Sequence, residues 1–226
     1  MTRKSVLIIG ANRAVGFNLV KAFIADSWEV TGTVPPQARV DKDPALAELE
    51  KTGIKILELD YLNEGTIERA AIAYGNRPLD ILVNLGGPPP KPKHWYEQTA
   101  DLMAEQFGVM TVGPIITAKH FLLQLERAAD AKIVNVSSSF GSIAANTFGF
   151  FLAYRAAKAA LHQSVLTMAR EWEAEGRKVT TVCVDPGFLA AHSRSWDGGG
   201  DMNACIACLM RIFERITPKD NGAFLL

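Results

Sequence analysis

Residues 5–16 read SVLIIGANRAVG, an apolar run that leads directly into a glycine-rich turn. The aliphatic run predicts a buried strand, and the residues after the turn have helical periodicity. Small residues at Gly10, Ala14 and Gly16 let the chain turn sharply and let a ligand approach the amides at the helix N-terminus, where a pyrophosphate binds favourably. The spacing differs from the two-glycine fingerprint of larger dehydrogenases. Taken alone, it is also compatible with an ordinary strand-to-helix turn.

The same alternation continues along the whole chain. Seven short runs rich in aliphatic and β-branched residues alternate with about six helical segments, and no repeat or break in composition divides the chain. The strands are almost continuously apolar, which is typical of a parallel sheet covered by helices on both faces. A length of 226 residues suits one domain. We therefore predict a single α/β domain over residues 1–226, a Rossmann-type, doubly wound, seven-stranded parallel sheet. Predicted helices include 63–75, 97–107, 112–129, 151–175 and 202–216.

Composition excludes several classes of partner. The chain has 24 Lys and Arg against 24 Asp and Glu, so a nucleic-acid-binding surface is not expected. The N-terminal apolar run is too short for a membrane span or a signal peptide, and no membrane partner is expected. Cys183, Cys205 and Cys208 cannot pair completely, which favours reduced thiols and a cytoplasmic location. We predict no metal site, because the cysteines at 205 and 208 fall in an apolar helical run without a nearby histidine.

A tyrosine and a lysine share one face of the predicted helix 151–175. Tyr154 and Lys158 have helical spacing with Leu161, Val165 and Trp172, so they point toward the core. A buried ammonium group is costly unless a polar partner meets it. A phenol together with a bound ligand would be such a partner.

Five motifs occur in a characteristic order. They are the glycine turn, Asn84-Leu85-Gly86-Gly87, Ser138 after the fifth strand, Tyr154-x-x-x-Lys158, and Asp185-Pro186-Gly187 after the sixth strand. With these motifs the chain resembles the short-chain dehydrogenase/reductase family over its whole length. It is most similar to the compact carbonyl-reductase branch that includes sniffer-type and C-factor-type proteins.

The resemblance implies a catalytic trio. Tyr154 would act as general acid or base, Lys158 would lower the pKa of Tyr154 and bind the nicotinamide ribose, and Ser138 would orient the carbonyl group. The neighbouring Ser137 and Ser139 are equally compatible with local hydrogen bonds that end the strand.

The resemblance also implies a dinucleotide cofactor. No acidic residue follows the second strand, which ends in Thr33-Val34-Pro35-Pro36, and Arg13 lies in the glycine turn, so we expect NADP(H) to be preferred over NAD(H). Arg39 is a weaker candidate that is also compatible with a solvated charge. Asp60 is expected beside the adenine, or equally as a cap of the following helix. The expected cofactor-binding residues are Gly10, Asn12, Arg13, Val15, Asp60, Tyr61, Asn84, Gly86, Tyr154, Lys158, Pro186, Gly187 and Leu189.

Two positions depart from the family pattern. Met110 stands where relatives commonly have an asparagine that supports proton relay, and a thioether cannot donate a hydrogen bond. Ala191 replaces a threonine that usually contacts the nicotinamide carboxamide. The leading hypothesis is an NADP(H)-dependent carbonyl reductase or alcohol dehydrogenase. The alternatives are a non-redox enzyme, such as a cyclase, isomerase or dehydratase, and a dinucleotide-sensing protein.

The substrate is expected to be a fairly hydrophobic ketone, aldehyde or alcohol. Residues 86–98 and 188–201 are predicted to overhang the carboxyl edge of the sheet. His94 and His192, on these loops, have no companion metal ligands. Family members often pair through the two long helices here near 112–129 and 151–175, so a homodimer is expected. Candidate aromatic lining residues are Trp95, Tyr96, Phe148, Phe150, Phe151 and Trp196.

Overall fold

The computed structural model describes residues 3–85, 87, 90, 92–186 and 201–225. In it, seven parallel strands form one sheet in the order β3-β2-β1-β4-β5-β6-β7, which confirms the predicted Rossmann-type fold. The sheet order reverses between β1 and β4, and this is where ligands bind in open α/β folds. The strands are Ser5–Ile9 (β1), Glu29–Val34 (β2), Lys55–Glu58 (β3), Ile81–Asn84 (β4), Ala131–Val136 (β5), Val179–Val184 (β6) and Phe224–Leu225 (β7).

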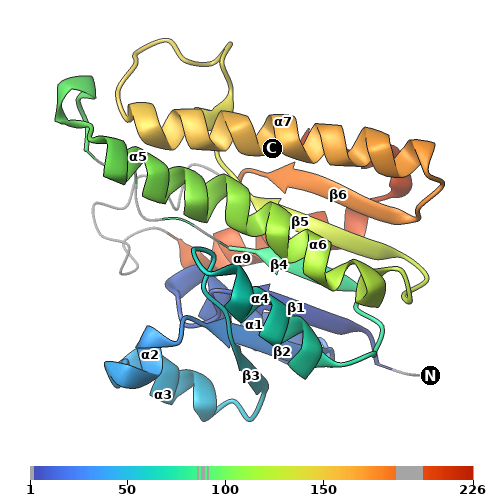
Figure 1. Ribbon diagram of the computed structural model, residues 1–226. Coiled ribbons are helices and arrows are strands. Elements are labelled where there is room, and N and C mark those ends of the chain that lie inside the picture. Colours follow the sequence, from blue (N-terminus) through green and yellow to red (C-terminus); the bar gives the residue numbers. More distant parts are fainter. Residues whose placement is uncertain (1–2, 86, 88–89, 91, 187–200, 226) are drawn as a thin grey trace.

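The two faces of the sheet carry separate hydrophobic cores. On β1, Val6 and Ile8 pack into one core with α1 and α9, whereas Leu7 and Ile9 pack into the other with α4, α6 and α7. All four side chains are buried, which explains why the strand is continuously apolar. Figure 1 shows α4, α5, α6 and α7 on the near side of the sheet and α9 behind it. The helices are Ala14–Ala25 (α1), Gln37–Val40 (α2), Pro44–Glu50 (α3), Glu64–Tyr74 (α4), Ala100–Phe107 (α5), Gly113–Leu125 (α6), Leu152–Ala174 (α7) and Met202–Arg215 (α9).

Two helical features differ from the sequence prediction. The short helices α2 and α3 lie between β2 and β3, where no helix was predicted. A local signal exists, because Asp43 accepts a hydrogen bond from the Ala45 amide at 2.9 Å and Pro44 occupies the first helical position. The expected break between helices 97–107 and 112–129 is also wrong. A π-helical turn over Gly108–Val112 joins α5 and α6 instead.

Parallel strands place their carboxyl ends at one edge of the sheet. The glycine turn after β1, Asn84 at the end of β4 and Ser138 just after β5 therefore meet at that edge. Among the helices described, none is long and apolar enough to cross a membrane.

Candidate active site

The glycine turn after β1 is tightly packed. Gly10 has a φ of +79°, and a Cβ atom there would lie 2.8 Å from the Leu85 carbonyl oxygen. A Cβ atom on Gly16 would overlap the Gly10 carbonyl oxygen. Both positions therefore require glycine, and the turn lies directly against the end of β4.

The N-terminus of α1 is open to an anion. Its N-cap is Arg13, which makes no capping side-chain hydrogen bond, and the first turn, which includes Val15, carries no acidic residue. Helix N-termini bear unsatisfied amide groups and a partial positive charge, and both stabilise a bound phosphate. The turn and this helix end therefore fit the pyrophosphate of a dinucleotide.

Asn12 holds the glycine turn to the neighbouring helix α3. Its Nδ2 donates to the Asp43 carboxylate at 2.9 Å, while its Oδ1 is buried and has no hydrogen-bond partner in the described part of the chain. An unsatisfied buried acceptor is unfavourable. A ribose hydroxyl is a donor that would satisfy it, so this position also fits a nucleotide.

A hydrogen-bond chain runs beneath the carboxyl edge of the sheet. The Tyr61 hydroxyl donates to Asn84 Oδ1 at 2.9 Å, Asn84 Nδ2 donates to Asn135 Oδ1 at 2.8 Å, and Asn135 Nδ2 donates to the Val182 carbonyl at 3.0 Å. Burial raises the pKa of Tyr61 well above its ordinary value. Two expected cofactor residues, Tyr61 and Asn84, thus belong to one network. Asn135 was not expected, although a polar residue within a buried strand is a signal for it.

Asp60 does not cap the following helix. Its side chain accepts a hydrogen bond from the Leu62 amide at 2.9 Å, which closes a local turn, and the N-cap position of α4 belongs to Asn63. The capping alternative for Asp60 is therefore wrong.

The structure brings Ser138, Tyr154 and Lys158 together. Ser138 follows β5, and its side chain interacts with the Tyr154 hydroxyl. Lys158 Nζ donates to the Val136 carbonyl oxygen at 2.9 Å and lies 5.8 Å from the centre of the Tyr154 ring. Both Tyr154 and Lys158 lie in the first two turns of α7, on one face.

Burial dominates the electrostatics of this trio. The pKa of Tyr154 is raised to about 12, mainly by burial and in part by the Asp185 carboxylate, while the Ser138 hydrogen bond acts in the opposite direction. Burial lowers the pKa of Lys158 to about 8, although Cys183 and Asp185 favour its charged form. The net shift of the Tyr154 pKa is therefore upward and not the expected lowering, because burial is its largest cause. The phenol has lost its solvation, and the Lys158 ammonium donates to a backbone carbonyl.

The π-helical turn packs against the catalytic helix. Thr111 Oγ1 donates to the Ala157 carbonyl oxygen at 2.8 Å. Met110 is fully buried, and its Sδ lies 2.9 Å from the position that a Cβ atom on Gly87 would occupy. Met110, at the position where the resemblance led us to expect an asparagine, thus places a buried apolar side chain against Gly87.

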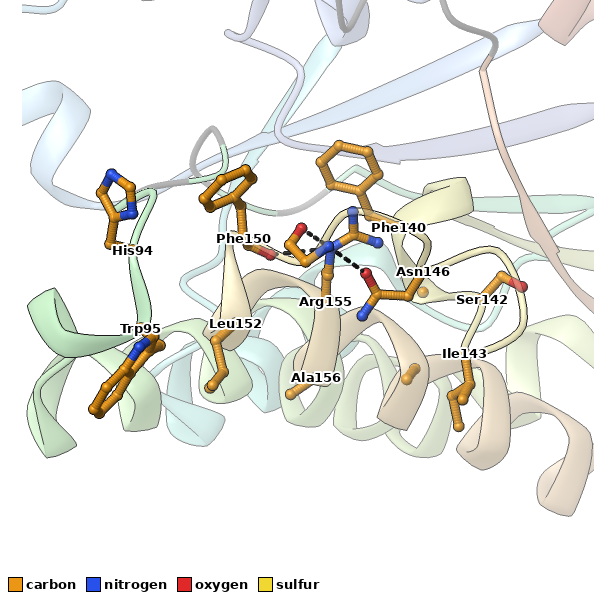
Figure 2. A pocket seen from close by; sticks show the side chains of 13 residues that line it. His94, Trp95, Phe140, Ser142, Ile143, Asn146, Phe150, Leu152, Arg155 and Ala156 are labelled. Carbon is orange, nitrogen blue, oxygen red and sulfur yellow. Dashed lines mark hydrogen bonds between the residues drawn. The ribbon is translucent and has the colours of Figure 1, made fainter.

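An aromatic cluster adjoins Tyr154. Its ring meets the Phe140 ring edge-on, with centroids 6.1 Å apart, and Phe140 also packs against Phe148 and Phe151. Trp95 and Phe150, both expected near a substrate, line a cavity of about 610 Å³ beside α7, and Figure 2 shows them at its wall.

Three expected cofactor-binding residues lie outside the described residues, and a fourth lies directly beside them. Pro186 is the last described residue after β6. Gly86, Gly187 and Leu189 lie outside the described residues, as do Ala191, His192 and Trp196.

Comparisons with known proteins identify the family. A family model described as short chain dehydrogenase matches residues 4–196. The C-signal protein of Myxococcus xanthus is 30% identical over 122 residues, which cover 54% of this chain and 72% of that protein. An uncharacterised oxidoreductase of Saccharomyces cerevisiae is 26% identical, over 99% of this chain and 94% of that protein.

Solved structures of the same family superpose over the whole chain. The NADPH-bound carbonyl reductase from chicken fatty liver has a TM-score of 0.86 and 26% identity, covering 100% of this chain and 96% of that one. Carbonyl reductase Sniffer of D. melanogaster has a TM-score of 0.85 and 26% identity, covering 99% and 96%. The chain therefore belongs to the short-chain dehydrogenase family, whose members are oxidoreductases that use a nicotinamide cofactor.

Proposed function

We propose that this protein is an NADP(H)-dependent carbonyl reductase or alcohol dehydrogenase. The observation that carries the proposal is the meeting of Ser138, Tyr154 and Lys158 at the carboxyl edge of the sheet, on the same edge as the glycine turn. Both sites lie where open α/β sheets bind ligands.

The trio suits the reductive direction. A phenol with a pKa of about 12 is protonated at neutral pH, so Tyr154 holds a proton that it donates to the carbonyl oxygen. Ser138 orients that oxygen, and the Lys158 ammonium stabilises the phenolate left after donation. When bound, the nicotinamide cofactor supplies the hydride that the carbonyl carbon accepts. The product is an alcohol, and a proton from solvent restores the phenol.

The chain favours a cofactor with a 2′-phosphate. The residues that follow Val34 at the end of β2 are prolines, so the positions directly after this strand offer no carboxylate to a free 2′-hydroxyl. Arg13 is the N-cap residue of α1, lies in the glycine turn and is the first candidate cation for the phosphate. Arg39 is a poorer candidate, because it pairs with Glu50 at 3.2 Å and Glu58 at 2.8 Å. The chicken relative, solved with NADPH, supports the same choice.

We also propose that the protein is a cytoplasmic homodimer with a fairly hydrophobic substrate. The free thiols of Cys183, Cys205 and Cys208 suit a reducing compartment. Leu123 on α6 and Leu166 on α7 are exposed by 67% and 38%, which suits pairing of these two helices with a second copy.

Met110 favours one second candidate, a non-redox enzyme on the same scaffold. Its buried thioether offers no hydrogen bond to a relay water beside Lys158. In that case the protein would bind the dinucleotide without oxidising it.

A substrate panel separates the two candidates. The protein is mixed with NADPH or NADH and a set of aromatic ketones and quinones, and loss of nucleotide absorbance is followed. We expect turnover with at least one carbonyl compound and a preference for NADPH that Arg13→Gln lowers by about tenfold. NADPH binding without turnover across the panel would favour the non-redox candidate.

A further inference from the structure

The cavity beside α7 adjoins the proposed reduction site through Phe140, whose ring contacts that of Tyr154. Its volume is about 610 Å³, and its described lining includes neither Tyr154 nor Ser138. Figure 2 shows how three parts of the chain enclose it. The walls come from the segment before α5, the segment between β5 and α7, and the outer side of α7; they include His94, Trp95, Phe140, Phe150, Ala156 and Ala159.

Among the described lining residues, Arg155 alone carries a permanent charge. Its side chain is 7% exposed, and its guanidinium carbon lies 4.2 Å from the centre of the Phe140 ring and 4.7 Å from that of Phe148. Its Nε donates to the carbonyl oxygens of Gly149 and Phe150 at 3.1 and 3.0 Å. The flat faces of the guanidinium are thus covered by aromatic rings, whereas the edge that carries Nη1 and Nη2 makes neither of these contacts.

No carboxylate neutralises this buried cation within the described residues. Nη2 of Arg155 is buried without a hydrogen-bond partner, and Arg155 takes part in no ion pair there. Removing a charge from water without a counter-ion is costly. Four arginines nearer the surface show the usual arrangement, since each contacts a glutamate: Arg39, Arg77, Arg170 and Arg177.

The backbone around Arg155 is strained into its present shape. Phe150 and Phe151 have φ values of 62° and 55°, a left-handed region that bulky residues rarely adopt. The Phe151 amide donates to the Lys93 carbonyl oxygen at 2.8 Å, and Lys93 Nζ lies 4.7 Å above the Phe150 ring. The strained segment therefore places an aromatic wall and a second cation beside the cavity.

We propose that this cavity binds a hydrophobic ligand that carries a carboxylate. A carboxylate oxygen accepts a hydrogen bond from Nη1 of Arg155, since Nη2 is buried, and the apolar part packs against Phe150, Trp95 and the alanines of α7. The guanidinium matches a carboxylate in charge and in donor chemistry. The mostly apolar walls and the absence of an acidic lining residue in the described part of the cavity select against cations and against strongly hydrated ligands.

Calorimetric titration with hydrocinnamate and with its uncharged methyl ester tests this site without any nucleotide present. We expect the wild type to bind the acid at least about tenfold more tightly than the ester. Arg155→Met should weaken acid binding about tenfold and leave ester binding unchanged. The matched control is Arg170→Met, the same substitution on the same helix at an exposed residue paired with Glu173, which should change neither affinity.

A second variant keeps the test decisive if Arg155→Met does not fold. Ala159→Phe fills the cavity and keeps the guanidinium, so both ligands should lose affinity while the melting temperature and NADPH affinity stay near wild type. Equal wild-type affinity for acid and ester, or no binding of either, would overturn the proposal. A third result would also overturn it: the wild type is a dimer that does not bind the acid, and Arg155→Met makes that dimer dissociate. A carboxylate of the second copy would then be the partner of Arg155. None of these readouts requires carbonyl reduction, so failure of the proposed enzyme function is separately visible.

Discussion

Two buried cations lie on one helix, and their surroundings differ. Lys158 is 3% exposed and Arg155 is 7% exposed, and both donate to backbone carbonyl groups. Around Lys158 are polar and acidic side chains: Tyr154 and His162 from α7, Cys183 from β6 and Asp185 directly after it. Around Arg155 the described contacts are aromatic rings and carbonyl oxygens.

The difference shows what each cation can do. Burial lowers the pKa of Lys158 to about 8, so its charge changes near physiological pH. Burial also lowers the pKa of Arg155, but a guanidinium begins so high that it stays charged. Lys158 suits chemistry in which protons move, whereas Arg155 suits permanent attraction of an anion. Four substitutions or conditions test this contrast.

Tyr154→Phe should have the largest effect on turnover. The variant lacks the proton donor, so we expect kcat to fall by about a thousandfold, with NADPH affinity near wild type. Steady-state kinetics and nucleotide titration measure the two quantities. Arg155→Met is the comparison variant and should leave kcat within a few fold. Equal losses in both variants would mean that the two faces of α7 do not have separate roles.

Lys158→Met should lower activity and raise stability. Turnover should fall about a hundredfold, because the ammonium no longer stabilises the phenolate. The free energy of unfolding should rise by roughly 2 kcal/mol at neutral pH, since a desolvated charge is replaced by an apolar chain of similar length. Urea unfolding measures it. Arg155→Met should instead lose about 2 kcal/mol with its two carbonyl hydrogen bonds and ring contacts. Stability changes of the same sign would contradict the comparison.

The loss of turnover at alkaline pH should depend on Lys158. Its folded pKa of about 8 means that the ammonium is present below that pH and lost above it, so the rate of carbonyl reduction should fall as pH rises through 8. Because the unfolded chain binds this proton more tightly, Lys158 should raise the free energy of unfolding above pH 8, and the Cys183 thiol, whose pKa burial raises to about 12, should oppose that rise from about pH 9. Lys158→Met should abolish that rise. An unchanged rise in this variant would assign the titration to another group.

Arg155→Lys should have the smallest effect. It keeps a positive charge but loses the planar fork and its stacking, so stability should fall by about 1 kcal/mol, or roughly 2–4 °C in melting temperature. Burial should lower the pKa of the new ammonium, as it does for Lys158, so the charge should be lost at alkaline pH. Hydrocinnamate binding should then become weaker. Calorimetry over a pH series measures this dependence. If hydrocinnamate affinity stays constant with pH in this variant, binding does not require the permanent charge of arginine.

The parts of the fold that could be predicted depend on local pattern. The buried strand β1 with its glycine turn follows from periodicity and residue size, and Tyr154 and Lys158 share a face because of their spacing. The polar residue Asn135 within β5 was overlooked, since its network with Asn84 and Tyr61 joins segments far apart in sequence.

The features that could not be predicted depend on contacts between segments that are distant in the sequence. Arg155 lies on the flank of α7 and becomes buried only because the segment with Phe140 and Phe148 folds over it. The direction of the Tyr154 pKa shift likewise depends on how completely several elements exclude water from the phenol. Desolvation is a property of the packed molecule. A motif alone therefore predicts which groups meet, but it does not predict the direction in which their pKa values shift.

The most direct test of the central claim is the fate of the hydride. NADPH carrying deuterium on the transferring face of its nicotinamide is mixed with the wild type and the ketone that the panel identifies, and the product is analysed by mass spectrometry. We predict an alcohol with one deuterium on the carbinol carbon, formed in equal amount to the nucleotide oxidised, and far less of it with Tyr154→Phe. An alcohol without deuterium, whichever face of the nicotinamide is labelled, would contradict the proposed hydride transfer. NADPH that binds but is never oxidised would contradict it too.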